Sequence, residues 1–216
     1  MKIVFAGYRS WALSAFIEVI ETCNIKDYEL VKNPEELGKV SNSVVIGAGW
    51  SWIIPQNVIE RNKVIALMHP SDLPDYAGGS PIQHQIIDGL TETKACLFKV
   101  DNKLDSGPVF LKKRMSLEGN IEDIFDSLKD ATRDLLVQFI TKYPSISETP
   151  QRHSKDSIRK RLQPKDSMLT KKDIQGLSTK NLYNLMRCRE NPYPNVYIED
   201  EFGRLYFEKV RYEKNE

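Results

Sequence analysis

Cysteine is scarce in this sequence, and its spacing argues against two kinds of site. The three cysteines, Cys23, Cys96 and Cys188, are far apart and form no C-x-x-C pair. Neither a disulfide framework nor a zinc site is therefore predicted. We expect a protein without a bound metal, in a reducing environment such as the cytoplasm.

Long apolar runs are absent as well. No window reaches the ~18 apolar residues that a membrane-spanning helix needs. The chain enters the apolar run 3–6 directly, with neither a basic segment nor a cleavable apolar stretch before it. We therefore expect a soluble protein that does not associate with a membrane.

The sequence also has little excess charge and few glycines in its first loop. Residues 7–10 lack the glycines of G-x-G-x-x-G, which argues against a dinucleotide site. The formal net charge is +1; it divides into +5 for 151–216 (15 Lys and Arg, 10 Asp and Glu) and −4 for 1–150 (16 and 20). This asymmetry suits a cationic rim for phosphates but is too weak to predict a nucleic-acid partner.

What the sequence does contain is a regular alternation of apolar runs and helical periodicity. Residues 31–39, which contain Pro34, are predicted as a loop. The alternation indicates an α/β fold with a Rossmann-like, mostly parallel sheet and flanking helices. The apolar stripe of the last helix is explained by core packing alone. Strands are predicted at 3–6, 43–47, 64–67, 94–100 and 109–115, and helices at 11–20, from Val58, from Pro81 and at 121–140.

The second part of the chain is predicted to be a small extension. Residues 143–155 hold two prolines and several Ser and Thr residues, which is typical of a linker. We place the main domain at 1–150 and the extension at 151–216. The extension is predicted to contain a short helix at 179–188 and a terminal β-hairpin of 196–198 and 205–210.

The stretch 65–87 is the part around which the chain is organised. A predicted buried strand ends at His69-Pro70, and a proline-rich loop with Gly78-Gly79 leads to the next helix. Asp105 follows in Leu-Asp-Ser-Gly-Pro. Open α/β sheets bind ligands at the carboxyl ends of their strands. From the residues alone, His69 is either a functional group or a buried core histidine, and Asp105 belongs either to a site or to an ordinary turn.

Four motifs together resemble the signature of the 10-formyltetrahydrofolate-dependent formyltransferases. They are His-Pro-Ser at 69–71, Leu-Pro at 73–74, Gly-Gly-Ser-Pro-Ile-Gln at 78–83 and Asp-Ser-Gly-Pro at 105–108. Pro-Lys-Asp-Ser at 164–167, Leu-Tyr-Asn at 182–184 and Asn-Pro-Tyr-Pro at 191–194 are similar to the segment that follows the catalytic domain in the methionyl-tRNA and sugar formyltransferases. Among these enzymes, the chain most resembles the sugar N-formyltransferases.

The resemblance implies a formyltransferase fold, 10-formyltetrahydrofolate as cosubstrate, and His69 and Asp105 as the catalytic residues. Histidine is mostly neutral at neutral pH, so His69 suits the general base, with Asp105 orienting it or stabilising the cation that develops. The family's Asn-x-His pair is incomplete here, because Leu67 occupies the asparagine position. A backbone N–H from 47–51 or 78–80 is expected to replace the missing donor.

The resemblance also assigns two groups of binding residues. For Trp50, Trp52 and the two isoleucines that follow, core packing beneath the sheet is the alternative, and for Ile53 and Ile54 it is expected to hold in part. For Arg9, the alternative is an ordinary solvated loop residue. Ser80 is expected to cap the helix that begins at Pro81. The folate side is expected to comprise Trp50, Ser51, Trp52, Ile53, Ile54, Pro70 and Leu104, and the substrate side Tyr8, Arg9, Gly78, Gly79, Ser80 and Arg161.

Three functions follow as hypotheses from the resemblance. The first is a transferase that formylates the amine of a nucleotide-linked amino-deoxy sugar, for a surface glycan or a pseudaminic-acid-type sugar. The second is a formyltransferase for another amine, such as methionyl-tRNA. The third is a folate-binding protein that lost activity with the change at Leu67. A homodimer is possible under each of them.

Overall fold

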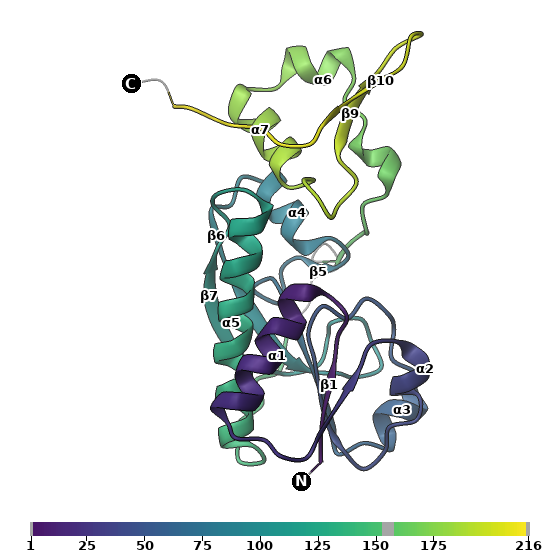
Figure 1. Cartoon of the computed structure of the whole chain (residues 1–216), viewed down its shortest axis with the longest axis vertical. Coiled ribbons are helices and arrows are strands. Elements are labelled where there is room, and N and C mark those ends of the chain that lie inside the picture. Colours follow the sequence, from purple (N-terminus) through teal and green to yellow (C-terminus); the bar gives the residue numbers. More distant parts are fainter. Residues whose placement is uncertain (1, 153–157, 215–216) are drawn as a thin grey trace.

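The computed structural model describes residues 2–152 and 158–214, and its centre is a sheet with helices on both faces (Figure 1). The six strands lie in the order β2-β1-β3-β4-β6-β7. Strands β1 to β4 are parallel, β6 runs antiparallel to β4, and β7 runs antiparallel to β6. The predicted α/β fold with a mostly parallel sheet is confirmed. The bounds are β1 Ile3–Ala6, β2 Tyr28–Val31, β3 Val44–Gly47, β4 Val64–His69, β6 Glu92–Lys99 and β7 Val109–Ser116.

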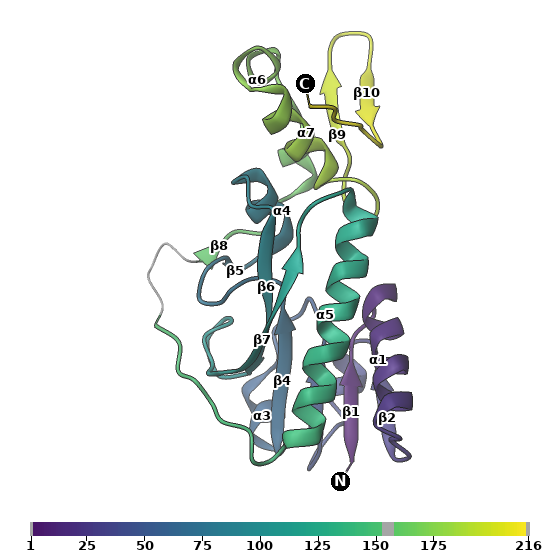
Figure 2. The same cartoon turned by 90° about the vertical axis from the view of Figure 1, so that its left-hand side faces the viewer.

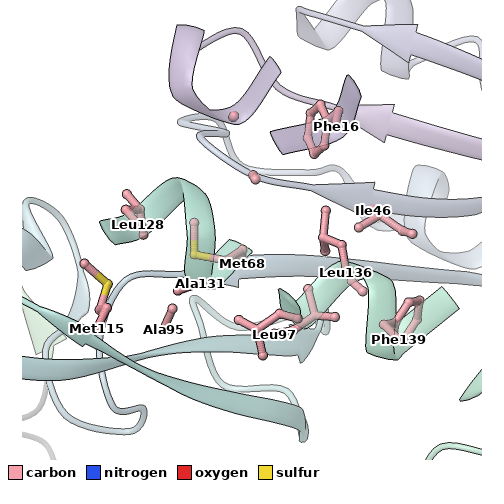
Figure 3. Packing of buried hydrophobic residues seen from close by; sticks show 14 of the residues in the cluster. Phe16, Ile46, Met68, Ala95, Leu97, Met115, Leu128, Ala131, Leu136 and Phe139 are labelled. Carbon is pink, nitrogen blue, oxygen red and sulfur yellow. The ribbon is translucent and has the colours of Figure 1, made fainter. Parts of the chain in front are cut away.

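The two faces of the sheet have separate cores. Helices α1 (Ser10–Thr22) and α5 (Ile121–Lys142) cover one face, and α2 (Pro34–Leu37) and α3 (Gln56–Glu60) cover the other (Figures 1 and 2). Side chains alternate along a strand, so β4 contributes to both cores. Figure 3 shows part of the larger core, where Ile46 and Leu97 of the sheet lie next to Leu136 and Phe139 of α5.

Helix α5 begins where its sequence provides a complete cap. The Asn120 side chain accepts from the N–H groups of Glu122 and Asp123, and the Asp123 carboxylate accepts from the N–H of Asn120. This capping box satisfies donors that the first turn of a helix leaves unpaired. The apolar stripe predicted for this helix is largely buried, at Ile121, Ile124, Leu128, Leu135 and Phe139.

Two elements differ from the sequence prediction. Tyr28–Val31 forms the edge strand β2, where Tyr28 and Glu29 leave little apolar pattern to recognise. Pro34–Leu37, in the predicted loop, forms the one-turn helix α2 because Asn33 accepts from the N–H of Glu36 and Pro34 occupies the first helical position. Both elements are short. Strand β2 forms by pairing at the edge of the sheet, and α2 forms through its cap, so neither shows a periodic apolar pattern.

The extension contains the predicted helix and hairpin. Strand β5 (Ala77–Gly78) pairs in parallel with β8 (Ile158–Arg159), and β9 (Val196–Glu199) pairs antiparallel with β10 (Arg204–Phe207). A 3₁₀ turn, η2, spans Pro164–Ser167, and helix α6 spans Lys171–Gly176. Helix α4 (Pro81–Ile87) contacts α7 (Thr179–Arg187). The division near residue 150 stays a prediction, and 153–155 of the predicted linker lie outside the described residues.

None of the helices in the described ranges is long and apolar enough to cross a bilayer.

A buried arginine joins the extension to the start of α5. The Arg187 guanidinium donates to the carbonyl oxygens of Leu117 at 2.6 Å and Gly119 at 2.8 Å, and to Oδ1 of Asn184 at 2.9 Å. Glu190 accepts from the N–H of Ile121 at 3.2 Å. Burial lowers the pKa of Arg187 from its ordinary value. Hydrogen bonds from Arg187 and Glu190 therefore connect the extension to the residues at the start of α5, the helix that flanks the sheet.

We expect Arg187→Met to lower the free energy of unfolding by about 2–4 kcal/mol, because a hydrogen bond to a charged group contributes about 1.5–3 kcal/mol and the buried carbonyl group of Leu117 would lose its donor. Urea unfolding followed by far-UV circular dichroism measures the change. Arg204→Met is the control; it removes an exposed ion pair with Glu199 and a contact with the Tyr197 ring, and should change stability little. Equal losses in the two variants would contradict this role of Arg187.

Candidate active site

The loops that follow β1, β3 and β4 open into a cavity of about 250 Å³. These strands point toward the extension, which closes the same end of the molecule (Figure 2). Two arginines and four aromatic residues are part of the lining, a combination that suits a ligand with a flat ring and an anionic group. The lining residues are Arg9, Trp11, Gly49, Trp50, Ser51, Met68, His69, Pro70, Gly78, Ser80, Pro81, Ile82, Gln83, Phe125, Leu128, Arg161, Leu162 and Tyr193.

His69 and Asp105 meet at this cavity. His69 is the last residue of β4, and its Nδ1 lies 3.4 Å from Oδ2 of Asp105. The same carboxylate oxygen accepts from the N–H of Gly78 at 2.8 Å. Nε2 of His69 lies 3.0 Å from the carbonyl oxygen of Tyr76. His69 lines the cavity, and Asp105, which is not part of the lining, faces Nδ1 of the ring.

Both ring nitrogens of His69 face oxygen atoms, but only the contact at Nε2 is a hydrogen bond, and it favours the tautomer with the hydrogen on Nε2. A carbonyl oxygen can only accept, so Nε2 carries a hydrogen and donates it to Tyr76. In the neutral ring, Nδ1 is then the nitrogen with the free lone pair, and it faces Asp105. A proton taken up at Nδ1 would be shared with a carboxylate, so the pair is arranged to accept a proton and stabilise the resulting imidazolium.

The loop after β3 supplies one wall of the cavity. Trp50 and Ser51 line it, and Oγ of Ser51 is 2.8 Å from the Tyr8 hydroxyl. The Trp52 ring lies against Trp50, with centroids 5.1 Å apart and nearly perpendicular planes, and against Tyr8 at 4.7 Å. The aromatic residues therefore support one another, with Trp50 innermost.

Several residues assigned to the folate side do not line the cavity. Pro70 does, whereas Trp52, Ile53, Ile54 and Leu104 do not. The partial core role expected for both isoleucines is correct for Ile54, which is 7% exposed, and wrong for Ile53, which is 86% exposed. Ile53 lies where the loop turns outward before Pro55, so its side chain has no sheet beneath it.

On the substrate side, the extension reaches across the loop before α4. Arg9, Gly78, Ser80 and Arg161 line the cavity, whereas Tyr8 and Gly79 lie beside it. The N–H of Gly79 donates to the carbonyl of Arg159 at 2.9 Å, and a Cβ on Gly79 would lie 2.4 Å from Cα of Arg161. A glycine at this position lets the two backbones approach closely enough to bring Arg161 to the cavity.

Ser80 has a different role from the expected one. It is the residue before α4, but its side chain makes no capping hydrogen bond, and its φ of 53° is left-handed. Its Oγ instead accepts from the N–H of Leu162 at 3.0 Å. The hydroxyl therefore holds the extension rather than the helix.

Comparison with known proteins identifies the family. A family model described as formyl transferase matches residues 17–142, more than half of the chain. The chain belongs to the formyl transferase family. The match includes β4 with His69, the loop before α4 and the loop with Asp105.

The similar proteins include two methionyl-tRNA formyltransferases. That of Lactobacillus johnsonii is 30% identical over 166 residues, which are 76% of this chain and 52% of the relative. That of Rickettsia bellii is 26% identical over 175 residues, 78% of this chain and 56% of the relative. The chain spans about half the length of the curated relatives it matches.

Solved structures extend the likeness to nearly the whole chain. A methionyl-tRNA formyltransferase from Clostridium thermocellum superimposes with a TM-score of 0.86 at 26% identity, covering 99% of this chain and 94% of that one. A 4-N formyltransferase from Francisella tularensis gives a TM-score of 0.78 at 16% identity, covering 99% and 98%. At that identity, the second likeness shows the shared fold and no more.

Leu67, at the position of the family's asparagine, packs into the sheet. It contacts the apolar cores beside β4 and does not line the cavity. A Cβ on Gly47, its neighbour in β3, would lie 2.2 Å from Cδ2 of Leu67. Of the expected replacement donors, the N–H groups of Gly78 and Gly79 already have acceptors, namely Asp105 and Arg159.

The Asp105 loop of this family member is held through its backbone carbonyl groups. Asp105 has a φ of 48°, a left-handed conformation that costs free energy for a residue with a side chain. The Gln151 side chain donates to the carbonyl oxygens of Asp105 at 3.0 Å and Gly107 at 2.6 Å. At Gly107, a Cβ would lie 1.8 Å from the carbonyl oxygen of Lys99, so only glycine fits.

Sequence reasoning missed much of the remaining lining. Gln83 and Tyr193 are within motifs that carried the resemblance, so their positions were available as a signal. Phe125 and Leu128 belong to the apolar stripe of α5, and their role at the cavity corrects the view that core packing explains the whole stripe. Burial raises the pKa of Tyr193, which therefore stays a protonated hydroxyl at neutral pH. The other missed residues are Trp11, Gly49, Met68, Pro81, Ile82 and Leu162.

Among the residues that the structure describes, no three His, Cys, Asp or Glu side chains gather as a metal site would require.

The fit at Gly107 gives a test of the loop. We expect Gly107→Ala to lower the free energy of unfolding by about 1–3 kcal/mol, the usual cost of forcing an extra methyl group into packed structure. Gly176→Ala is the control, because a Cβ there meets nothing within 4 Å. Thermal unfolding of both variants measures the difference. A Gly107→Ala variant as stable as Gly176→Ala would show that the loop relaxes freely.

Proposed function

We propose that the protein transfers a formyl group from 10-formyltetrahydrofolate to an amine. The observation that carries the proposal is the pairing of His69 with Asp105 at the cavity, in a chain of the formyl transferase family. Nδ1 of His69 is the nitrogen with a free lone pair in the neutral ring, which is what a general base requires.

The chemistry assigned to the pair runs as follows. The amine nitrogen attacks the formyl carbon, a C–N bond forms, and the carbonyl π electrons move to oxygen. Nδ1 of His69 takes the proton that the amine loses, and Asp105 stabilises the imidazolium. As the oxygen electrons return, the bond from the formyl carbon to N10 of the folate breaks, and N10 takes the proton from His69.

The folate side is proposed to be the wall that contains Trp50. Its Nε1 is buried and has no hydrogen-bond partner within the described part of the chain. A buried donor of this kind costs free energy unless a partner satisfies it. A pterin has acceptors along its edge and flat faces for aromatic contact, so it fits both the orphaned N–H and the ring. Bound there, it would bring the formyl group that the reaction transfers.

The acceptor is proposed to carry phosphate, and a nucleotide-linked amino sugar is our first candidate. Arg9 and Arg161 both line the cavity, and the extension that contributes Arg161 is the positively charged part of the chain. An N-formyltransferase from Helicobacter canadensis with a similar fold, 15% identical with a TM-score of 0.69, was solved with folinic acid and dTDP-3-aminofucose. Cytoplasmic location and a homodimer stay predictions.

A second candidate is methionyl-tRNA. It is favoured by the similarity to methionyl-tRNA formyltransferases, including the Clostridium thermocellum structure at 26% identity. Its terminal phosphates would suit the same arginines. A folate-binding protein without activity is the third candidate, and the loss of the family's asparagine at Leu67 is the observation that favours it.

One experiment separates these candidates. The protein is incubated with 10-formyltetrahydrofolate in parallel reactions. Each reaction contains one acceptor, either an amino sugar linked to UDP or dTDP, or methionyl-tRNA. Mass spectrometry then detects the gain of one formyl group on each acceptor. Transfer to a sugar supports the first candidate, transfer to tRNA the second, and folate binding without any transfer the third.

Asp105→Asn is expected to lower kcat by about 10²–10³, the usual effect of losing one group that stabilises developing charge. The amide oxygen can still accept from the N–H of Gly78, so the fold should be retained. Asp101→Asn is the matched control, because Asp101 lies in the same loop and bonds only Lys103 and Ser106. Equal rates for the two variants would remove Asp105 from the mechanism.

Folate binding should be visible in tryptophan fluorescence. Titration with folinic acid, corrected for its absorption, is expected to quench emission, and Trp50→Phe should remove much of that change because Trp50 lines the cavity. Trp52→Phe should retain more of it, since Trp52 lies behind Trp50 and is 41% exposed. The same quenching in Trp50→Phe as in the wild type would move the pterin away from this wall.

A further inference from the structure

A buried glutamine outside the cavity joins two of its walls. Gln85 lies in α4 and is 0% exposed. Its Nε2 donates to the carbonyl oxygen of Pro70 at 2.9 Å and to that of Pro81 at 2.9 Å. Its Oε1 accepts from the hydroxyl of Thr93, a buried residue of β6. Both hydrogens and the oxygen of the carboxamide are therefore engaged.

The two carbonyl groups determine which way the carboxamide points. If the amide turned over, its oxygen would face two carbonyl oxygens, and both partly buried acceptors would lose the side-chain donor. In the observed orientation, with the NH₂ group toward Pro70 and Pro81, the Thr93 hydroxyl donates to Oε1 and satisfies it. Thr93 therefore holds the glutamine oxygen, and the glutamine holds the two carbonyl groups.

The two carbonyl groups belong to the segments that hold the catalytic histidine. Pro70 follows His69 directly and lines the cavity, and Pro81 is the first residue of α4 on the opposite side of the loop. That loop, 70–80, contains Tyr76, which accepts from His69, and Gly78, which donates to Asp105. The Gln85 carboxamide thus joins the two ends of this loop, and residues in the middle of the loop contact the His69 ring and Asp105.

We propose that Gln85, oriented by Thr93, is a positioning residue for His69. It acts through the backbone of the 70–80 loop and does not touch the substrate. The role in catalysis rests on the formyl transfer proposed above, whereas the effect on the His69 ring does not. Neither residue carries a charge, and both stand behind the cavity wall, where they keep the ring in place during proton transfer.

Thr93→Val and Gln85→Met test the proposal, because each removes hydrogen bonds at nearly constant volume. We expect kcat to fall about 10- to 100-fold with little change in either KM, since a misplacement near 1 Å can cost 10²-fold in rate. Thr93→Ser retains the hydroxyl and should restore the rate. Thr132→Val is the matched control, a buried threonine of α5 whose hydroxyl has no partner among the described residues.

A second readout needs no activity. The chain has 3 histidines, so the His69 ring ¹H–¹³C signal can be assigned from its loss in His69→Gln. In Thr93→Val and Gln85→Met, this signal should move by more than its line width, whereas Thr132→Val and Thr93→Ser should leave it in place. If the wild type transfers no formyl group, the proposed function fails and this signal still decides the role of Gln85.

The proposal is overturned if Thr93→Val, folded by circular dichroism, leaves both the ring signal and kcat where Thr132→Val leaves them. It is also overturned if kcat falls only in proportion to the folded fraction while the ring signal stays unmoved. Should Gln85→Met fail to fold, Thr93→Val carries the test, because it removes one hydroxyl and leaves both glutamine donors in the chain.

Discussion

The His69 ring is held from two sides by groups that belong to different loops, and the rest of the site depends on keeping those loops together. Tyr76 accepts from one ring nitrogen, and Asp105 faces the other. The N–H of Gly78 bonds Asp105 and links the two loops directly. Each such hydrogen bond contributes only about 1 kcal/mol net, so the arrangement persists because several act together and all converge on one ring.

The sequence predicts the parts of this arrangement that local rules determine. Helix α5 has both a full apolar stripe and a capping box, so periodicity and caps agree. The meeting of His69 and Asp105 is implied by the family resemblance rather than by a local rule, because β6 runs antiparallel to β4 and ends beside Ala66. Local rules do not reveal that Phe125 leaves the core to line a cavity, because a cavity wall and a core present the same apolar pattern. Nor do they reveal the hydrogen bonds of Gln85 and Gln151, which join segments far apart in the chain.

The departure at Leu67 is accommodated by the neighbouring strand. Gly47 has no side chain, and Leu67 occupies the space that a Cβ there would need. The two residues form a matched apolar contact inside the sheet. Leucine has no donor in its side chain, so the oxyanion of the proposed reaction would need another one. Since Gly78 and Gly79 are engaged, the expected donors narrow to the loop after β3, which includes Gly49 and Ser51, and to Ser80.

The cavity is built from two parts of the chain with different roles. The pair of His69 and Asp105 and the wall that contains Trp50 come from loops of the sheet. Under the proposed function, these groups take part in formyl transfer to any acceptor. Arg161 and Tyr193 come from the extension, which the sheet holds through Gly79 and through the Arg187 contacts with the start of α5. The extension also pairs β8 with β5, which contains Gly78, so it supports the donor to Asp105 as well as the acceptor side. Under the proposed function, the acceptor would meet Arg161 and Tyr193 of the extension together with Arg9 and Ser80 from loops of the sheet, beside the same pair of His69 and Asp105.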